Sequence, residues 1–279
     1  MSDGAKYLAV NADDFGFTRD VNAGIVEAHL HGILTSTTLM ANGVEFDDAV
    51  SLARAHPTLD IGVHFVLVGG RSLLDPSRAL PRTVSGLIQA IALRRIRVYD
   101  ELRAQMAKVV EAGLRPTHVD THKHTHLLPP VLDALARLAE EFDARWVRRP
   151  FDLPLSGSPD DVPWKTRAVS RSFSFVRGHF NRVLARRHCF STDWFAGFQS
   201  TGRFGPQFVV HLLDHLPPGS TEFMVHPGYC TAELQAARTR LKESREQELR
   251  ALLDPSVIEA VRRNSIQLTP YDRLKTAHF

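Results

Sequence analysis

The chain has 279 residues, of which 43% are hydrophobic and 23% are charged. This balance excludes an intrinsically disordered protein and supplies enough apolar side chains for a full core. A formal net charge of +3 does not call for nucleic acid, and the sequence contains no basic, aromatic-interleaved module that would bind it. The two cysteines, Cys189 and Cys230, have no metal-type spacing and exclude a disulfide scaffold.

The amino-terminal sequence MSDGAKYLAVNADDFG has an acid and a glycine where a signal peptide would have basic residues. No apolar run is long enough for a membrane span. We therefore expect a cytoplasmic protein that meets a membrane, if at all, peripherally at the inner membrane. The sequence indicates no oligomeric state.

Short apolar strands alternate with helix-length amphipathic segments in the first half of the chain. The first strand is predicted at 6–11 and stops at the polar pair Asp13-Asp14. Asp20 is typical of an N-cap and predicts a helix that Gly32 closes. Three elements are predicted to follow, a strand at 33–40, a helix at 46–56 and a strand at 59–67.

The alternation continues to the carboxyl terminus. The predicted elements are a helix at 100–113, a strand at 118–120, a helix at 127–142, a strand at 145–148, and strands at 221–225 and 266–269 on either side of a helix at 233–253. Such alternation implies a parallel sheet with right-handed crossovers. With six or seven units, a closed or nearly closed, TIM-like (β/α) barrel is favoured over an open sheet. We expect one domain over 1–279, with an insertion or lid at about 155–205.

Polar residues fall directly after several predicted strands, at Asp13, Asp14, His64, His122 and His226. The carboxyl ends of strands are where barrel active sites assemble. Taken alone, the Asp13-Asp14 pair could be a turn or a helix cap, and His64 could be an ordinary core or surface histidine. Their shared position after strands favours a functional site.

The run HVDTHKHTH is the strongest single signal, because it places four of the chain's 14 histidines and one aspartate in residues 118–126. Imidazole is a common ligand of divalent metals, and two imidazoles with one carboxylate leave positions open for water and substrate. The competing interpretation is a surface histidine tract with low metal affinity. His226, in FMVHPG, is a candidate general acid or else a turn residue.

At these motifs the sequence resembles the YdjC-like carbohydrate deacetylase family. The resemblance is carried by NADDFGFTRDVNAGI, GILTSTTLMANG, FDDAV, IGVHFVLVGG, PTHVDTHKHTH and HPG, and it covers most of the chain. It implies an irregular (β/α) barrel and one divalent metal ion, Zn or Mg, bound by Asp14, His64 and His122. It also implies an N-acetylated sugar as substrate.

The family also resembles the NodB-type polysaccharide deacetylases. This more distant likeness implies that Asp13 is the general base, that His226 is the general acid, and that Arg148 in RRPF orients the base. In the NodB style His126 could be a metal ligand, whereas the closer family leaves it in the substrate pocket. The expected substrate contacts are Phe15, Asn42, His124 and His126.

Two stretches, LMANGVEFDDAVSLA and HFVLVGGRSLL, resemble the hopanoid-biosynthesis-associated branch of the family, for which an N-acetylglucosaminyl hopanoid is the implied substrate. The first alternative is a chitooligosaccharide deacetylase. Alternatives of other classes are a non-catalytic metal-binding or sugar-binding protein and a metallophosphatase. The phosphatase is disfavoured because no second carboxylate set for a second metal is evident.

One segment suits a lipid-linked substrate. Between Lys165 and His188 there are seven Lys or Arg and no Asp or Glu, and seven phenylalanines and Trp194 lie between Phe173 and Phe204. Basic and aromatic side chains together are typical of segments that settle on anionic headgroups. We therefore expect peripheral membrane contact through 165–204, the alternative being an ordinary helix with a solvated basic face.

Overall fold

The computed structural model describes residues 4–155 and 162–274. Its eight strands are β1 Lys6–Phe15, β2 Ser36–Leu39, β3 Asp60–Phe65, β4 His118–Thr121, β5 Trp146–Val147, β6 Trp194–Ala196, β7 Gly219–Val225 and β8 Ile266–Leu268. The α-helices are α1 Arg19–His31, α2 Phe46–Ala55, α3 Val84–Ala92, α4 Val98–Glu111, α5 Pro129–Glu141, α6 Trp164–Phe173, α7 Arg177–Arg186, α8 Pro206–Asp214, α9 Ala232–Ala236, α10 Glu243–Leu253 and α11 Pro255–Arg263. Three short 3₁₀ segments are η1 His122–Leu127, η2 Ser174–Val176 and η3 Tyr271–Arg273.

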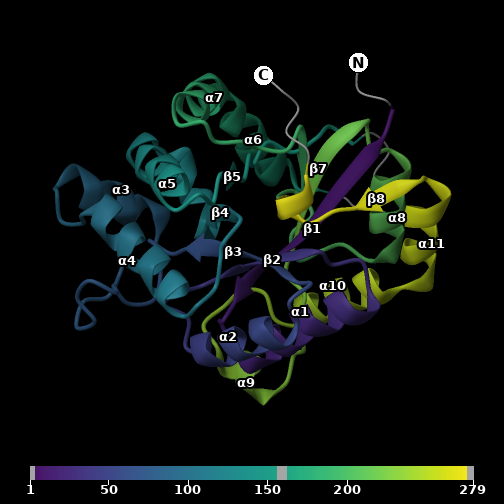
Figure 1. Cartoon of the computed structure of the whole chain (residues 1–279), viewed down its shortest axis with the longest axis horizontal. Helices are drawn as coiled ribbons and strands as arrows, with labels where there is room; N and C mark the ends of the chain where they lie inside the picture. The colour runs from purple at the N-terminus through teal and green to yellow at the C-terminus, as the bar shows by residue number, and fades with distance from the viewer. Residues whose placement is uncertain (1–3, 156–161, 275–279) are drawn as a thin grey trace.

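All strand pairs are parallel, in the order β5-β4-β3-β2-β1-β7-β6. One edge of β1 is shared, because its first residues pair with β8 and its last residues pair with β2. Isolated parallel bridges link the segments next to the two outer strands, Trp146 of β5 with Phe190 and Asp152 with Phe195 of β6. The curled sheet therefore nearly closes on itself, with helices around it (Figure 1), and the predicted irregular (β/α) barrel is confirmed.

The strands are buried on both faces, as expected for a parallel sheet covered by helices. Every residue of β2 and β3 is buried, and β1 is buried from Leu8 onward. The main hydrophobic cluster joins β1 to the apolar faces of the surrounding helices. Such a core holds the strand ends in fixed relative positions, and these ends carry the polar residues.

Most predicted elements are confirmed, with three corrections. Thr18, not Asp20, caps α1, since the Thr18 hydroxyl accepts from the Val21 amide. Asp20 is buried and accepts from the Thr231 amide and hydroxyl. Gly32 ends α1 without a left-handed backbone; a Cβ there would be 2.5 Å from the Leu252 carbonyl oxygen.

The third correction concerns the helix predicted at 233–253. The structure has two helices there, α9 and α10, separated by residues 237–242. The apolar pattern did not reveal this break, because Leu241 within it is buried like a residue on the apolar face of a helix. Among the described residues, none of the helices combines the length and the apolar character needed to cross a bilayer.

Candidate active site

The adjacent carboxylates of Asp13 and Asp14 reach the same site because β1 is irregular at this point. Neighbouring residues of a regular strand point to opposite faces of the sheet. Between Ala12 and Phe15 the pairing with β2 shifts by one residue, and Asp14 has φ +69, in the left-handed region. A bulge of this kind redirects side chains, and Asp is one of the few residues other than glycine that tolerates a positive φ.

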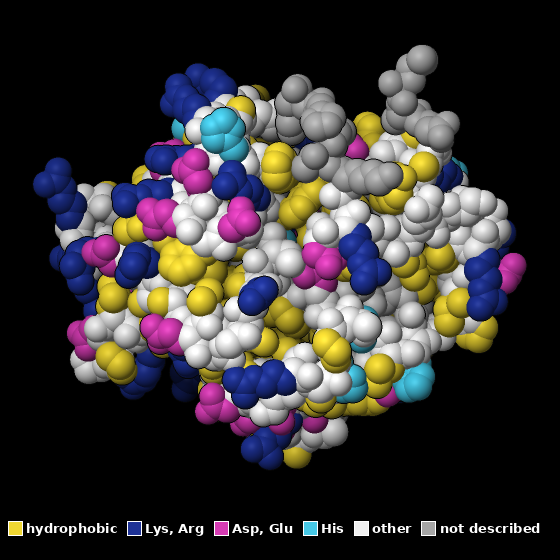
Figure 2. Space-filling model, in the orientation of Figure 1, with side chains coloured by type: hydrophobic (Ala, Val, Ile, Leu, Met, Phe, Trp, Pro, Cys, Tyr) yellow, Lys and Arg dark blue, Asp and Glu magenta, His cyan; other side chains and the backbone are white. Residues whose placement is uncertain are grey.

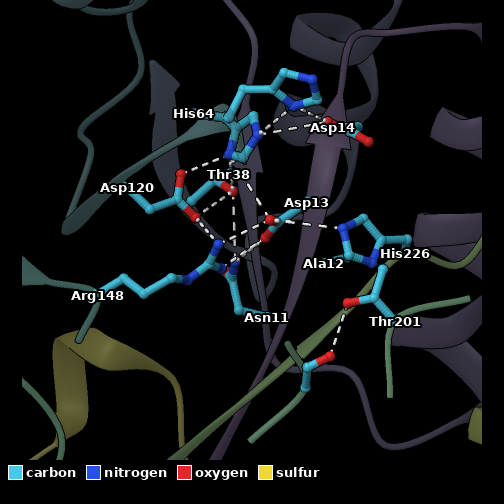
Figure 3. A network of polar contacts seen from close by, with 12 residues as sticks. Asn11, Ala12, Asp13, Asp14, Thr38, His64, Asp120, Arg148, Thr201 and His226 are labelled. Carbon is cyan, nitrogen blue, oxygen red and sulfur yellow. Dashed lines mark hydrogen bonds and ion pairs between the residues drawn. The ribbon is translucent and has the colours of Figure 1, made fainter. Parts of the chain in front are cut away.

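Arg148 binds the Asp13 carboxylate through two hydrogen bonds, from its two terminal nitrogens to Oδ1 at 2.6 Å and Oδ2 at 2.8 Å. The same guanidinium contacts Asp120 Oδ2 at 2.6 Å and, through Nε, Glu222 Oε1 at 2.5 Å. All four side chains are buried, and Figure 3 shows Arg148 against Asp13 and Asp120. Burial alone would raise the pKa of Asp13, but Arg148 and His64 hold it well below its usual range. Asp13 is therefore ionised at neutral pH.

Three donor atoms form a nearly equilateral triangle, Asp14 Oδ1, His64 Nε2 and His122 Nδ1. The carboxylate oxygen is 3.4 Å from each imidazole nitrogen, and the two nitrogens are 3.3 Å apart. Asp14 Oδ1 is buried and has no hydrogen-bond partner among the described residues. A buried carboxylate oxygen without a donor is costly unless a cation or proton compensates it. The donor set fits one divalent metal ion.

His64 is oriented from behind by Asp120. The ring Nδ1 lies 2.6 Å from Asp120 Oδ1, so it carries the proton and leaves the Nε2 lone pair facing the triangle. Burial would lower the pKa of His64, but without a metal Asp120 and Asp13 raise it to about 9. A cation in the triangle would therefore replace a proton on Nε2 and bind the lone pair. Asp120 Oδ2 also accepts a hydrogen bond from the Thr38 hydroxyl at 3.2 Å. Ligand histidines commonly have a carboxylate behind them in this way.

A second group, Asp13, His64 and Asp120, has its oxygen and nitrogen atoms close enough together to hold a cation. It is a weaker candidate, because the guanidinium of Arg148 already lies against both carboxylates. The proton on His64 Nδ1 is also directed at Asp120. A metal there would have to displace a buried positive charge, so the triangle around Asp14 Oδ1 is the better metal site.

Asp14 has a second partner that the sequence motifs do not indicate. Arg245, on α10, donates to Asp14 Oδ2, and both side chains are buried. Burial alone would raise the pKa of Asp14, but Arg245 and His122 hold it well below its usual range. Arg245 occupies one carboxylate oxygen and leaves the other for the triangle. No local pattern in the sequence singles this arginine out, because its partner lies 231 residues away.

His226 follows β7 and lies on the other side of Asp13, with its Nε2 3.8 Å from Asp13 Oδ2. The turn that carries it packs against α1, where a Cβ on Gly24 would be 2.5 Å from Gly228 Cα. Its backbone amide donates to Glu248 Oε2 at 2.6 Å. Burial is the main cause that lowers the pKa of His226 to about 4, so the ring is neutral at pH 7.

The predicted substrate contacts have different outcomes. Phe15 is fully buried within the hydrophobic cluster, and this prediction is wrong because the β1 bulge turns its side chain into the core. His126 is also fully buried, and its nitrogens are bonded to the Thr121 hydroxyl at 2.7 Å and the Arg148 carbonyl at 3.1 Å. It can therefore be neither a metal ligand nor a surface of the pocket in this arrangement; it supports the backbone of Arg148.

His124 and Asn42 stay as predicted substrate contacts. The His124 ring lies among Phe173, Phe195 and Phe198, and its Nδ1 has no hydrogen-bond partner among the described residues. Asn42 is half-buried and donates to the Arg71 carbonyl oxygen at 3.2 Å. Of the triangle, His122 alone has substantial exposure, with 30% of its side chain accessible. The site therefore opens on the His122 side.

Fold and site together define a (β/α)-barrel protein with a candidate mononuclear metal centre at the carboxyl ends of its strands. Residues 7–263 match the family model described as YdjC-like protein, and the chain belongs to that family. It is 33% identical to a carbohydrate deacetylase of Geobacillus stearothermophilus, over 95% of this chain and 97% of the relative. It is 34% identical to a carbohydrate deacetylase of Brevibacillus brevis, over 96% and 99%.

A solved structure from Enterococcus faecalis has the same fold. It is the crystal structure of a protein proposed to cleave cellobiose phosphate, with a TM-score of 0.73 and 24% identity. The match covers 96% of this chain and 98% of the other. The family resemblance inferred from the motifs is thus confirmed along nearly the whole length.

Proposed function

We propose that the protein is a metal-dependent N-deacetylase that hydrolyses the acetamide of an N-acetylglucosaminyl substrate to acetate and a free amine. The observation that carries the proposal is the triangle of Asp14, His64 and His122 beside the paired Asp13 and His226. The relatives named carbohydrate deacetylases, which align over nearly their full length, support the same activity.

The residues divide the chemistry among them. A divalent cation held by the triangle would act as a Lewis acid toward the acetyl carbonyl. Asp13, ionised and fixed by Arg148, is placed to take a proton from the attacking water. His226 is placed to give a proton to the departing sugar nitrogen. Because His226 is neutral at pH 7, it must gain that proton during turnover. Asp13 Oδ2 lies 3.8 Å from His226 Nε2 and is placed to pass on the proton that it takes from the water.

Zinc is the proposed metal. The three donor atoms, 3.3 to 3.4 Å apart, are close enough together to share one such ion. Two imidazoles and one carboxylate also suit zinc better than magnesium, which prefers oxygen ligands.

The proposed acceptor is a hopanoid glycolipid, reached at the membrane surface. Support comes from the segment of α6, η2 and α7, which forms part of the predicted insertion or lid at about 155–205; residues 156–161 of it lie outside the described part. Trp164 is 73% exposed and Phe175 is 89% exposed, within a stretch that has seven cationic and no acidic residues over 162–188. Figure 2 shows Lys and Arg side chains gathered over α7. Each cation near an anionic surface contributes about 1 kcal/mol.

The test is acetate release by the metal-reconstituted protein from two substrates, an N-acetylglucosaminyl hopanoid in mixed vesicles and soluble chitobiose. Faster release from the glycolipid supports the proposed acceptor. Faster release from chitobiose would replace it with the chitooligosaccharide alternative. No metal-dependent release from any N-acetylglucosaminyl compound would leave a non-catalytic metal-binding or sugar-binding protein.

Membrane contact has its own test, co-sedimentation with anionic vesicles. A variant with Trp164→Ser and Phe175→Ser should be recovered with the vesicles less than the original chain. The matched control is Val44→Ser, since Val44 is 88% exposed and lies before α2, far from this segment in the chain. Equal recovery of all three proteins would argue against insertion of these side chains.

A further inference from the structure

A cavity of about 620 Å³ lies between helix α6 and the segments around β5 and β6, and none of the Asp13, Asp14, His64, His122 or His226 side chains lines it. Its lining includes four arginines and two aspartates, Arg149, Arg167, Arg171, Arg177, Asp152 and Asp193. Even without Arg167, the guanidinium groups outnumber the carboxylates among the described lining residues. A concave surface with this excess of guanidinium groups attracts anions.

Both aspartates of the cavity are already bonded within the protein. Asp152 accepts from the backbone amides of Phe198 and Gln199, each at 3.1 Å, and from the Ser170 hydroxyl at 3.2 Å. Asp193 Oδ2 accepts from the amide and the hydroxyl of Ser220, both at 2.8 Å. No ion pair joins either aspartate to Arg149, Arg171 or Arg177 in the part of the chain that the structure describes. Burial also raises the pKa of Asp152 to about 6, which reduces its charge near neutral pH.

Two of the arginines lie against the same aromatic ring. The guanidinium carbon of Arg177 lies 5.0 Å from the centre of the Phe151 ring, and that of Arg149 lies 5.8 Å from the same ring. Arg149 donates to the backbone carbonyl oxygens of Asp193 and Thr192, but its Nε is buried and has no hydrogen-bond partner among the described residues. Burial and the nearby charge of Arg177 lower the pKa of Arg149.

Two like charges that line one cavity, with a buried N–H left over, are unfavourable unless an anion in the cavity compensates them. We propose that Arg149 and Arg177 bind the phosphate group of a phosphate ester in this cavity. A phosphate monoester carries nearly two negative charges and three strong acceptor oxygens, which suits paired guanidinium groups better than a single carboxylate does. Arg171 lines the same cavity and adds guanidinium donors.

The ester has two sources, a soluble sugar phosphate and the headgroup of an acidic phospholipid. Both present the same oxyanion to the arginines. The exposed Trp164 and Phe175 lie on the α6–η2 segment that covers the cavity, so either source can approach from that side. The site stands apart from the deacetylase proposal, because phosphate binding is measured without turnover.

The soluble source is tested by calorimetric titration of the full chain with inorganic phosphate and with glycerol 3-phosphate. The double variant Arg149→Gln with Arg177→Gln should raise Kd by about tenfold or more, since each hydrogen bond to a charged group is worth about 1.5–3 kcal/mol. The matched control, Arg182→Gln with Arg186→Gln, removes the same charge from exposed positions on α7 that do not line the cavity.

The lipid source is tested by co-sedimentation with vesicles that contain phosphatidic acid, against vesicles of phosphatidylcholine alone. If the protein binds the soluble esters, the ligand is a soluble phosphate ester. If it binds only the vesicles with phosphatidic acid, the ligand is a lipid headgroup. In that case the binding should be lost in the Arg149→Gln, Arg177→Gln variant and kept in the control variant. Asp14→Asn should change neither the binding of the soluble esters nor the binding of the vesicles. If the double variant does not fold, Arg177→Gln alone, at the exposed rim, replaces it.

Three results would overturn the proposal. The first is an absence of binding to every probe. The second is an equal loss in the cavity and control variants, which would indicate nonspecific attraction. The third is a loss in Asp14→Asn but not in the cavity variant, which would place the phosphate at the metal centre.

Discussion

Arg245 donates a hydrogen bond to Oδ2 of Asp14, while Oδ1 of the same carboxylate faces His64 and His122. The arginine thus makes Asp14 a ligand through one oxygen only. It also supplies a positive charge to a carboxylate that is buried in the described structure. Removal of one partner of a buried ion pair costs about 3–5 kcal/mol, because the other charge is left uncompensated.

We predict that Arg245→Met lowers the free energy of unfolding by about 3 kcal/mol in the presence of a chelator. With zinc added, the loss of unfolding free energy should be smaller, because the bound cation then compensates the negative charge of Asp14. Urea unfolding with and without zinc measures both values. Arg250→Met on the same helix is the control, since Arg250 is exposed and its ion pair with Glu246 is worth at most about 1 kcal/mol. An equal loss of unfolding free energy with and without zinc would contradict the idea that the cation and Arg245 both compensate the charge of Asp14.

Asp13 and Asp14 are adjacent but should respond differently to the same substitution. Asp14→Asn should abolish tight metal binding, because it removes the only carboxylate of the triangle. Asp13→Asn should keep the metal and lower kcat by about 10²–10⁴-fold, the range expected for loss of a general base. Metal titration and acetate release on both variants separate the roles. Turnover retained in Asp13→Asn would remove it as the base.

Asp120 acts through His64, so its substitution should weaken metal binding without removing it. In Asp120→Asn the carboxylate that accepts from His64 Nδ1 at 2.6 Å is gone. Loss of such a supporting carboxylate typically costs about 10–100-fold in metal affinity. Competition with a calibrated chelator measures the change. An unchanged affinity would mean that Thr38, 3.3 Å from the same nitrogen, is a sufficient partner.

If His226 protonates the leaving amine, its importance should depend on the leaving group. His226→Ala should reduce hydrolysis of the sugar acetamide by about 10²-fold or more. Hydrolysis of an aryl acetate, whose phenolate leaves without a proton, should be affected much less. The ratio of the two rates in the variant and in the original chain is the measurement. The same loss for both substrates would point to a structural role for His226.

Asp60 lies at the start of β3, where its carboxylate accepts from the Thr117 hydroxyl and the Tyr271 amide, both at 2.7 Å. Burial raises the pKa of Asp60 from 3.8 to about 6. An acid whose pKa is higher in the folded state contributes stability below the unfolded pKa, and this is lost as the pH rises through the folded pKa. The relevant window is therefore from about pH 4 to about pH 6.

Asp60→Asn has no such titration. Its amide oxygen can still accept from the Tyr271 amide, and its nitrogen can donate to the Thr117 hydroxyl oxygen. We predict that the stability of the variant relative to the original chain rises by about 2–3 kcal/mol between pH 4 and pH 7, at 1.36 kcal/mol per pKa unit. Urea unfolding at the two pH values gives this difference. Asp133→Asn, at an exposed position on α5, is the control. A difference that does not change with pH would show that the buried Asp60 is not the titrating group.

Local patterns were sufficient for much of the fold. Apolar strands of four to eight residues that alternate with amphipathic segments identify a parallel sheet, since period and length are properties of contiguous residues. The same patterns place Asp14, His64 and His122 after strands, and parallel strand ends meet at one edge. The resemblance to the deacetylase family selected these three residues as one ligand set, and in the structure their donor atoms lie within 4.8 Å of one another.

Only the tertiary structure decided the details that depend on distant partners. Arg245 contacts Asp14 across 231 residues, and no periodicity or motif encodes such a pair. Phe15 and His126 stand beside the motifs, but one is turned into the core by the β1 bulge and the other is bonded on both nitrogens. Side-chain direction and hydrogen-bond partners are set by the packing of whole elements, whereas the order of elements is written in local sequence.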